Sequence, residues 1–255
     1  MAKSYLSKYH GIISDVEKNH FWFRARKDVL SRVIRRFIPT PSKKTFLEVG
    51  FGTGELLSLF EKMEFTMSGV DINEVARTHA KHRSHATLYV KPFLQFTNTP
   101  YDALGMFDVL EHQQKDVQFL LHAHALLKKN GLLFVTVPAG PWLWSDMDKQ
   151  IGHARRYTKQ TLLTTVSKAG FEPLWCNYWN VFLSPFYAVW KIFNAKMESA
   201  TPEEFVAHIN PILNTLFFYT ITIENQLTLR VPFLFGTSLI VVARKKRMKM
   251  HDSAS

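Results

Sequence analysis

The chain has 255 residues, of which 46% are apolar and 21% charged, a balance typical of folded globular proteins rather than disordered ones. This length suits one α/β domain with additions, so we expect residues 1–255 to form a single domain. The only cysteine, Cys176, excludes an internal disulfide and a cysteine-rich metal site, which favours a reducing, cytoplasmic location. The net charge of +11 favours anionic partners.

Residues 1–43 are predicted to form an N-terminal helical lid. Within them, residues 24–37 carry apolar side chains at helical spacing on one side and arginine or lysine on the other, and two prolines then end the pattern. The apolar positions are Val29, Leu30, Val33, Ile34 and Phe37.

Residues 44–179 alternate short apolar segments with helical patterns, which predicts βαβ units. The expected strands cover residues 45–49, 66–70, 86–90, 101–107, 132–137 and 171–178, and a last strand lies within 236–244. The expected helices cover residues 54–62, 74–82, 117–128 and 159–168, the third ending at a cap formed by Asn130 and Gly131. We therefore predict a Rossmann-like, seven-stranded, mostly parallel sheet with helices on both faces.

Residues 180–235 are predicted to be an apolar helical insertion before the last strand. Positions 205–223 carry no formal charge and reach the length of a membrane span, but their polar residues favour a buried or interfacial helix pair. The segment is rich in aromatic side chains, among them Phe182, Phe186, Tyr187, Trp190, Phe193, Phe217, Phe218 and Tyr219. These could form a cap over a hydrophobic acceptor at a membrane surface, or pack on the sheet or in a dimer interface.

The basic tail, residues 245–255, has two interpretations. Its cations could attract an anionic membrane surface and attach the protein peripherally, or it could be a solvated terminus. The sequence leaves the oligomeric state open.

The segment from Phe46 to Gly54 predicts a strand that runs into a glycine-rich turn and opens a helix. Glycine lets the backbone approach a ligand closely, and a helix N-terminus offers free N–H groups and partial positive charge to a carboxylate or phosphate. Counting from Gly50 or from Gly52, the third glycine of a dinucleotide-binding fingerprint is missing. The turn therefore predicts a different polar ligand.

The pattern acidic-x-Gly-x-Gly-x-Gly, with Glu48 as its acidic member, resembles motif I of class I S-adenosylmethionine methyltransferases. Asp71 closes the second strand 17 positions after Gly54, where that family has the carboxylate that accepts both ribose hydroxyls. Residues 101–112 and 126–138 are similar to the fourth-strand and fifth-strand segments of the broad type-11 group, which includes ubiquinone and menaquinone methyltransferases. The resemblance implies S-adenosylmethionine as cofactor, no metal, and a small-molecule or lipid-like acceptor such as a sugar, quinone or lipid intermediate.

The cofactor-binding residues that follow from this resemblance surround the glycine turn and the ends of the second and fourth strands. They are Glu48, Gly50, Phe51, Gly52, Gly54, Asp71, Ile72, Phe107 and Asp108. The family often has an acidic residue near the adenine after the third strand, where this chain has Lys91. Backbone groups or Phe93 would have to recognise the adenine instead.

The resemblance also suggests that Trp22, Phe23 and Arg26 fold over the cofactor as a lid. The two aromatic side chains could instead only seal the helix against the sheet.

Candidate groups for the acceptor lie after the fourth strand and in the loop 142–157. His112 and His153 are candidate bases, because a base for an acceptor hydroxyl should titrate near neutral pH. Tyr157 joins them as a catalytic candidate, and Trp142 and Arg156 as substrate-binding candidates. A structural role stays open for each histidine: packing at the start of a helix for His112, and a salt-bridged loop for His153.

Two other functions fit the same residues. The basic charge would suit a nucleic-acid methyltransferase, but the chain has Asp108-Val-Leu-Glu111 where enzymes acting on exocyclic amines carry an Asn/Asp-Pro-Pro-aromatic run, so nucleic acid is not the expected partner. A non-catalytic scaffold with a methyltransferase fold is the second alternative.

Overall fold

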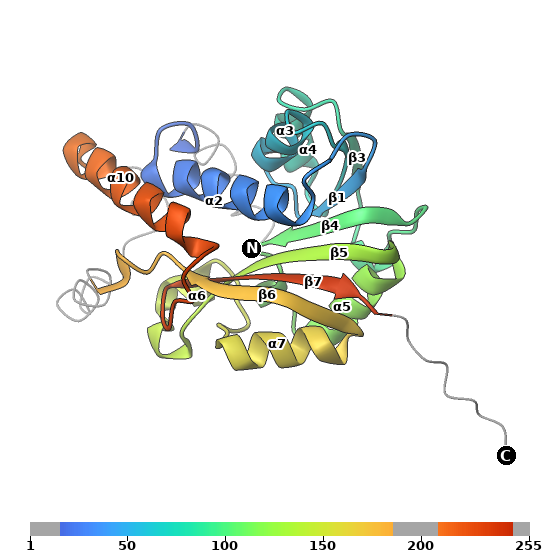
Figure 1. Cartoon of the computed structure of the whole chain (residues 1–255). Coiled ribbons are helices and arrows are strands. Elements are labelled where there is room, and N and C mark those ends of the chain that lie inside the picture. The colour runs from blue at the N-terminus through green and yellow to red at the C-terminus, as the bar shows by residue number, and fades with distance from the viewer. Residues whose placement is uncertain (1–15, 186–208, 247–255) are drawn as a thin grey trace, which may run out of the picture.

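The computed structural model describes residues 16–185 and 209–246. Its central feature is a seven-stranded sheet with the strand order β3-β2-β1-β4-β5-β7-β6 (Figure 1). The strands are β1 (Thr45–Val49), β2 (Thr66–Asp71), β3 (Thr87–Val90), β4 (Tyr101–Phe107), β5 (Leu127–Pro138), β6 (Phe171–Trp179) and β7 (Ser238–Lys245). Only β7 runs antiparallel to its neighbours, so the prediction of a mostly parallel, Rossmann-like sheet is confirmed.

Helices cover both faces of this sheet (Figure 1). The described helices are α2 (Phe21–Phe37), α3 (Glu55–Glu61), α4 (Glu74–Lys81), α5 (Asp116–Ala125), α6 (Asp146–Gln150), α7 (Lys159–Lys168) and α10 (Pro211–Thr228). Apolar residues of α2, α3, α4 and α10 share one buried cluster with the sheet, and those of α5 and α7 share the other. Each face of the sheet therefore has its own core, as expected for a doubly wound α/β fold.

Helix α2 forms where the sequence predicts it and begins three residues earlier, at Phe21. The side chain of His20 caps it by accepting a hydrogen bond of 3.2 Å from the backbone N–H of Trp22. Its apolar stripe, which includes Val29 and Val33, is completely buried against the sheet. This packing lays the helix across the edge of the sheet where the glycine turn lies.

The predicted boundary between the helix at residues 117–128 and the strand at residues 132–137 is wrong. Helix α5 ends at Ala125, and β5 begins at Leu127, ahead of the expected cap at Asn130. Leu127 is buried opposite Tyr101 of β4, and the pairing register then shifts, so the intervening polar residues bulge from the strand. Asn130 does adopt a left-handed conformation with φ of 62°, but within this bulge and not at a helix end.

The insertion before β7 is described in part. Helix α10 docks on α2, where the side-chain amide of Asn225 donates 2.9 Å hydrogen bonds to the carbonyl of Ala25 and to the Asp28 carboxylate. Four of the predicted cap aromatics, at positions 186, 187, 190 and 193, and tail residues 247–255 lie outside the described residues. Within the described part, no helix is long and apolar enough to cross a membrane.

Candidate active site

The carboxyl ends of β1 and β4 lie side by side at the point where the strand order reverses, which is where open α/β sheets bind ligands. The glycine turn follows β1, and Asp108 follows β4. Helix α2 passes over both. The topology therefore brings the two predicted motifs to one edge of the sheet.

The glycine turn requires glycine for both conformation and space. Gly50, Gly52 and Gly54 have φ angles of 72°, 50° and 78°, in the left-handed region that side chains disfavour. A Cβ atom on Gly50 would lie 2.6 Å from a methyl of Val109, and one on Gly54 would lie 2.7 Å from the backbone of Ala80. The turn can thus pass close to the β4 end and to α4 only without side chains.

A cavity of about 380 Å³ lies between this turn, the β4 end and α2. It brings together eight of the predicted site residues: Glu48, Gly50, Phe51, Gly52, Phe107, Asp108, His112 and His153. The three lid candidates, Trp22, Phe23 and Arg26, also line it. Cofactor-side and acceptor-side predictions thus meet in one hollow.

The other cofactor-side predictions lie around the cavity and not in its lining. Asp71 accepts a 3.0 Å hydrogen bond from the backbone N–H of Gly52, which ties the β2 end to the glycine turn. Gly54 is the N-cap residue of α3, and Ile72 is 59% exposed. Phe93 is buried against Phe119 in the core, at a ring distance of 4.7 Å.

Three acceptor-side predictions also lie outside the lining. Tyr157 is buried and donates a 2.9 Å hydrogen bond to Asp116, whose charge adds to burial in raising the pKa of the phenol. The indole of Trp142 is on the surface, 67% exposed. Arg156 donates from Nε to the Asp148 carboxylate at 2.8 Å, so it orders the loop that carries His153.

Asp108 has a strained backbone at the end of β4. Its φ of 60° is rare for a residue with a side chain, and such strain concentrates at functional sites. Its carboxylate accepts hydrogen bonds from Arg26 at 2.6 Å and from the hydroxyl of Thr136 at 3.1 Å. The Arg26 contact fastens the lid helix to the floor of the cavity.

Two buried glutamates on the cofactor side give the cavity an acidic character. Glu48 is 3% exposed, burial raises its pKa, and its Oε2 has no hydrogen-bond partner in the described structure. Glu17, which sequence reasoning missed, accepts hydrogen bonds from Thr53 at 2.7 Å and Arg83 at 2.6 Å. Burial raises the pKa of Glu17 to about 7. A cationic ligand would relieve both desolvated carboxyl groups.

His112 and His153 also line the cavity, and their rings face each other. Their ring centroids are 4.8 Å apart. His112 is exposed at one side, but the protein around its ring desolvates it and, followed by the nearby His153, lowers its pKa. His112 closes the 3-10 turn η2 (Leu110–His112), so the expectation that it begins a helix is wrong. Glu111, which precedes it, is completely buried beside both rings and was also missed, although it stands in the segment 101–112 that carried the resemblance.

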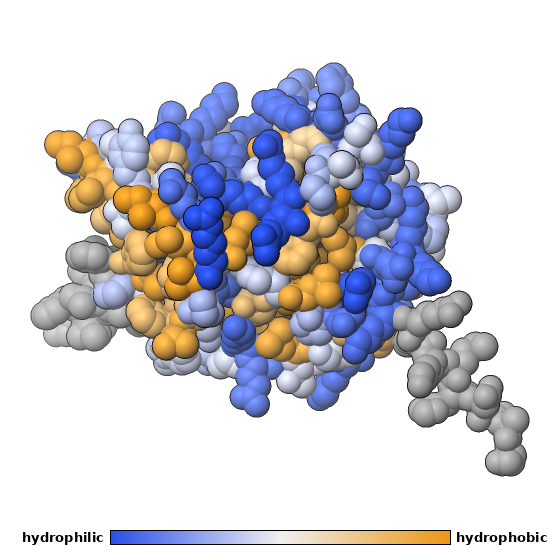
Figure 2. Space-filling model, in the orientation of Figure 1, coloured by the Kyte–Doolittle hydropathy of each residue, from blue (hydrophilic) through white to orange (hydrophobic). Residues whose placement is uncertain are grey.

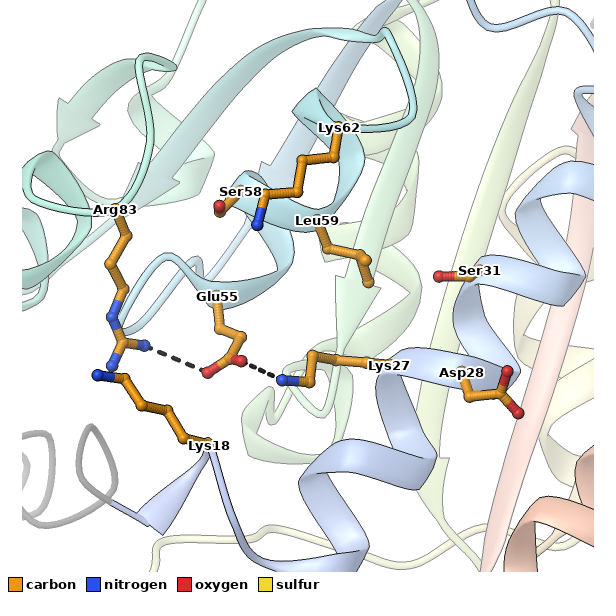
Figure 3. Close-up of a pocket in the computed structure, with 9 residues that line it drawn as sticks. All are labelled: Lys18, Lys27, Asp28, Ser31, Glu55, Ser58, Leu59, Lys62 and Arg83. Carbon is orange, nitrogen blue, oxygen red and sulfur yellow. Dashed lines mark hydrogen bonds and ion pairs between the residues drawn. The ribbon is translucent and has the colours of Figure 1, made fainter.

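A second hollow, of about 450 Å³, lies outside this cavity between α2 and α3 (Figure 3). Three of its charged groups pair with one another, since Lys27 and Arg83 both bind Glu55, the latter at 3.3 Å. Glu55 and Lys27 also line the first cavity. The ion pairs therefore connect the lid to α3, and we do not assign this hollow a ligand.

Comparison with known proteins gives the family. The family described as methyltransferase domain matches residues 22–175, more than half of the chain. The ubiquinone biosynthesis O-methyltransferase of Histophilus somni is 32% identical over 105 residues, which are 36% of this chain and 44% of that protein. A probable S-adenosylmethionine-dependent methyltransferase of Mycobacterium tuberculosis is 26% identical over 164 residues, 62% of this chain and 58% of that protein. The chain thus matches about half the length of these relatives.

Solved structures agree on the fold. Phosphoethanolamine N-methyltransferase 2 of Haemonchus contortus, in complex with S-adenosylmethionine, is similar with a TM-score of 0.61 and 15% identity, covering 97% of this chain and 60% of that one. Magnesium protoporphyrin IX methyltransferase of Synechocystis, with bound S-adenosylhomocysteine, has a TM-score of 0.56 and 13% identity, covering 88% and 84%. With the glycine turn, the sheet order and the family match, the chain belongs to the class I S-adenosylmethionine-dependent methyltransferases.

Proposed function

We propose that this protein transfers a methyl group from S-adenosylmethionine to a hydroxyl oxygen of a small or lipid-like acceptor. The observation that carries the proposal is that the glycine turn, His112 and His153 all line one cavity. The ubiquinone biosynthesis relative is named as an O-methyltransferase, which supports an oxygen acceptor. A quinone, sugar or lipid intermediate would each present such an oxygen.

The acidic end of the cavity suits the cofactor. Glu48 lines it and has an unpaired carboxyl oxygen, and the expected ligand carries a sulfonium and an ammonium group. We propose that Glu48 and Asp108 hold these charges, while Asp71, Ile72 and the glycine turn hold the nucleoside. When bound, S-adenosylmethionine supplies the electrophilic methyl group.

The histidine end suits the acceptor. We propose that His112 and His153 activate the acceptor hydroxyl, and that Arg26 and the lid aromatics exclude water above it. Tyr157 and Arg156 support this end by binding Asp116 and Asp148, and so would act through the loop and not on the acceptor itself. Trp142, on the surface, would contact only a long acceptor.

A lipid-like acceptor is favoured by the outer surface of α10. Figure 2 shows apolar side chains gathered on the part of this face where α10 lies. Their positions follow one helical stripe: Ile212, Leu216, Tyr219 and Ile223, each more than half exposed. An apolar stripe exposed beside the lid is a suitable approach for a molecule with a hydrocarbon tail.

The test is transfer of tritiated methyl from S-adenosylmethionine to a catechol, the same catechol with a polyprenyl chain, a sugar and an RNA. We expect methylation of a catechol hydroxyl, faster with the prenyl chain. Cofactor binding without any labelled product would favour the scaffold alternative, and labelled RNA would favour the nucleic-acid alternative. Either result overturns the proposal.

A further inference from the structure

We infer that Glu111, His112 and His153 bind a divalent transition-metal cation of the zinc type at the histidine end of the cavity. Each side chain offers one ligand atom, and the three atoms all lie within 4.8 Å of one another. Two imidazoles and one carboxylate form a donor set that zinc and similar cations prefer. The family resemblance implied no metal, so this inference departs from that expectation and rests on the arrangement of these residues alone.

Each histidine makes a hydrogen bond through one ring nitrogen of the kind that metal-binding histidines make. Nδ1 of His112 lies 3.0 Å from the carbonyl oxygen of Gly152, and Nδ1 of His153 lies 2.8 Å from the carboxylate of Asp148. Both partners accept hydrogen bonds, so each imidazole carries its proton on Nδ1. This leaves the Nε2 lone pair of each ring for a cation, an arrangement that protein metal sites use to orient histidine.

The buried side chain of Glu111 is a second, independent observation that points to a ligand. Its side chain is completely buried, and neither carboxylate oxygen has a hydrogen bond within the described structure. Nε2 of His153 is 3.7 Å from one of these oxygens, too far for a hydrogen bond but close enough to share a cation. An unpaired buried carboxyl group is costly unless something binds it.

The neighbouring charges do not neutralise Glu111. Arg26 binds Asp108 at 2.6 Å, and Arg156 binds Asp148 at 2.8 Å, so each of these guanidinium groups already has a carboxylate. Three carboxyl groups therefore lie beside two guanidinium groups around the histidine pair, and Glu111 is the one without a guanidinium partner. Burial and the nearby Asp108 raise the pKa of Glu111, and a bound cation would relieve this unfavourable burial.

Three protein ligands leave coordination positions that open to the cavity, as in catalytic zinc sites. A catalytic role for the cation would deepen the proposed function and rests on it, whereas the binding of the metal does not depend on that function. An acceptor hydroxyl at an open position would lose its proton to water, since a cation lowers the pKa of a bound hydroxyl. Its oxygen would then form the bond to the methyl carbon as the carbon–sulfur bond breaks and leaves its electron pair on sulfur. His112 and His153 would thus activate the acceptor hydroxyl through the cation that they bind.

The test is a titration of the full chain, freed of metal with a chelator and dialysed, with ZnCl₂ by calorimetry. We expect one equivalent to bind, and His112→Ala, His153→Ala and Glu111→Gln each to weaken binding by roughly 100-fold or more. His85→Ala, which removes an exposed histidine outside the cavity, is the matched control and should bind as the wild type does. Circular dichroism checks that each variant is folded.

A second measurement avoids variants altogether. X-ray absorption of the zinc-loaded wild type should show two imidazole nitrogens and oxygen donors at about 2.0 to 2.1 Å. Absence of a stoichiometric site, or equal zinc affinity in the His112 and His153 variants, would overturn the inference. Zinc binding without any methyl transfer would leave the metal site standing and contradict the proposed function, and transfer unaffected by chelator would remove the cation from the reaction.

Discussion

Asp71 connects the cofactor prediction to a specific contact, because its carboxylate already accepts a hydrogen bond from Gly52 of the glycine turn. Asp71→Ala should weaken binding of S-adenosylhomocysteine by about 1.5 to 3 kcal/mol, since hydrogen bonds to a charged group are lost. Calorimetry measures the change. Glu172→Ala is the control, because this carboxylate on β6 is in an exposed ion pair with Arg244 of β7. A silent Asp71 variant would mean that the cofactor lies elsewhere.

The thiol of Cys176 should be unreactive. Burial raises its pKa to about 12, so only a small part is thiolate at pH 8.5. Since the thiolate is the nucleophile, we expect iodoacetamide to alkylate the native protein at least about 100-fold more slowly than the unfolded protein in urea. Mass spectrometry over time follows the reaction. Equal rates in the two states would show that β6 opens readily at this position.

Glu17 should make stability depend on pH. Its pKa is raised to about 7 from an ordinary 4.5, so the folded state binds more protons, and its contribution falls as pH rises from about 4.5 through 7. Relative to the wild type, Glu17→Gln should therefore gain on the order of 1 kcal/mol between pH 5 and pH 8.

Urea unfolding at the two pH values measures this difference. His20 has the opposite slope, because burial lowers its pKa to about 4, but it is present in both proteins and cancels. A difference that does not change with pH would mean that Thr53 and Arg83 keep Glu17 ionised.

At the scale of elements, α10 depends on one buried amide. Asn225 is 1% exposed, donates to Ala25 and Asp28 of α2, and accepts a 2.8 Å hydrogen bond from the indole of Trp179. Asn225→Ala would leave buried partners unsatisfied and should lower the free energy of unfolding by about 2 to 4 kcal/mol. Denaturant titration measures it.

Asn214→Ala is the matched control on the same helix. This half-buried residue also makes two hydrogen bonds to the N-terminal segment, to Phe21 and Asn19, and it is more open to water than Asn225. We expect a loss below about 1 kcal/mol. Equal losses in the two variants would contradict the argument that burial makes the Asn225 contacts important.

The sequence predicted those elements that depend mainly on residues close to one another along the chain. The stripe on α2, the glycine turn and the strands β1, β2 and β4 follow from apolar spacing and turn chemistry, and all were confirmed. The boundary at Leu127 could not be predicted, because it depends on pairing with Tyr101 in another strand. The same holds for Glu111: the sequence places it next to His112, but only the fold brings His153 beside it and leaves its oxygens without partners.

At the scale of the molecule, the lid, the cavity and α10 form one continuous arrangement. Helix α2 lines the cavity with Trp22 and Arg26 on one side and packs against α10 on another, where its Phe21 ring lies 5.3 Å from that of Phe217. The outer stripe of α10 is therefore mechanically connected to the cover of the site. If α10 binds a lipid surface, this connection would place the cavity close to the proposed lipid-like acceptor.

We propose that the stripe and the basic C-terminal segment attach the protein peripherally to anionic membranes, the stripe by apolar burial and each cation by about 1 kcal/mol near the surface. Full-length protein should float with anionic liposomes and less with neutral ones. The variant Ile212→Ser, Leu216→Ser, Ile223→Ser should lose flotation, because these side chains are 78%, 56% and 56% exposed.

Leu94→Ser with Leu174→Ser is the control for the stripe variant, since it removes exposed apolar residues of η1 (Phe93–Gln95) and β6 and should float as the wild type does. A chain ending after Lys246 tests the basic segment without cutting into β7, and we expect it to keep partial flotation that no longer depends strongly on salt. If the wild type itself fails to float, the stripe does not bind lipid surfaces. A concentration-dependent mass in light scattering, abolished by the same triple substitution, would then assign the stripe to contact between two copies of the chain.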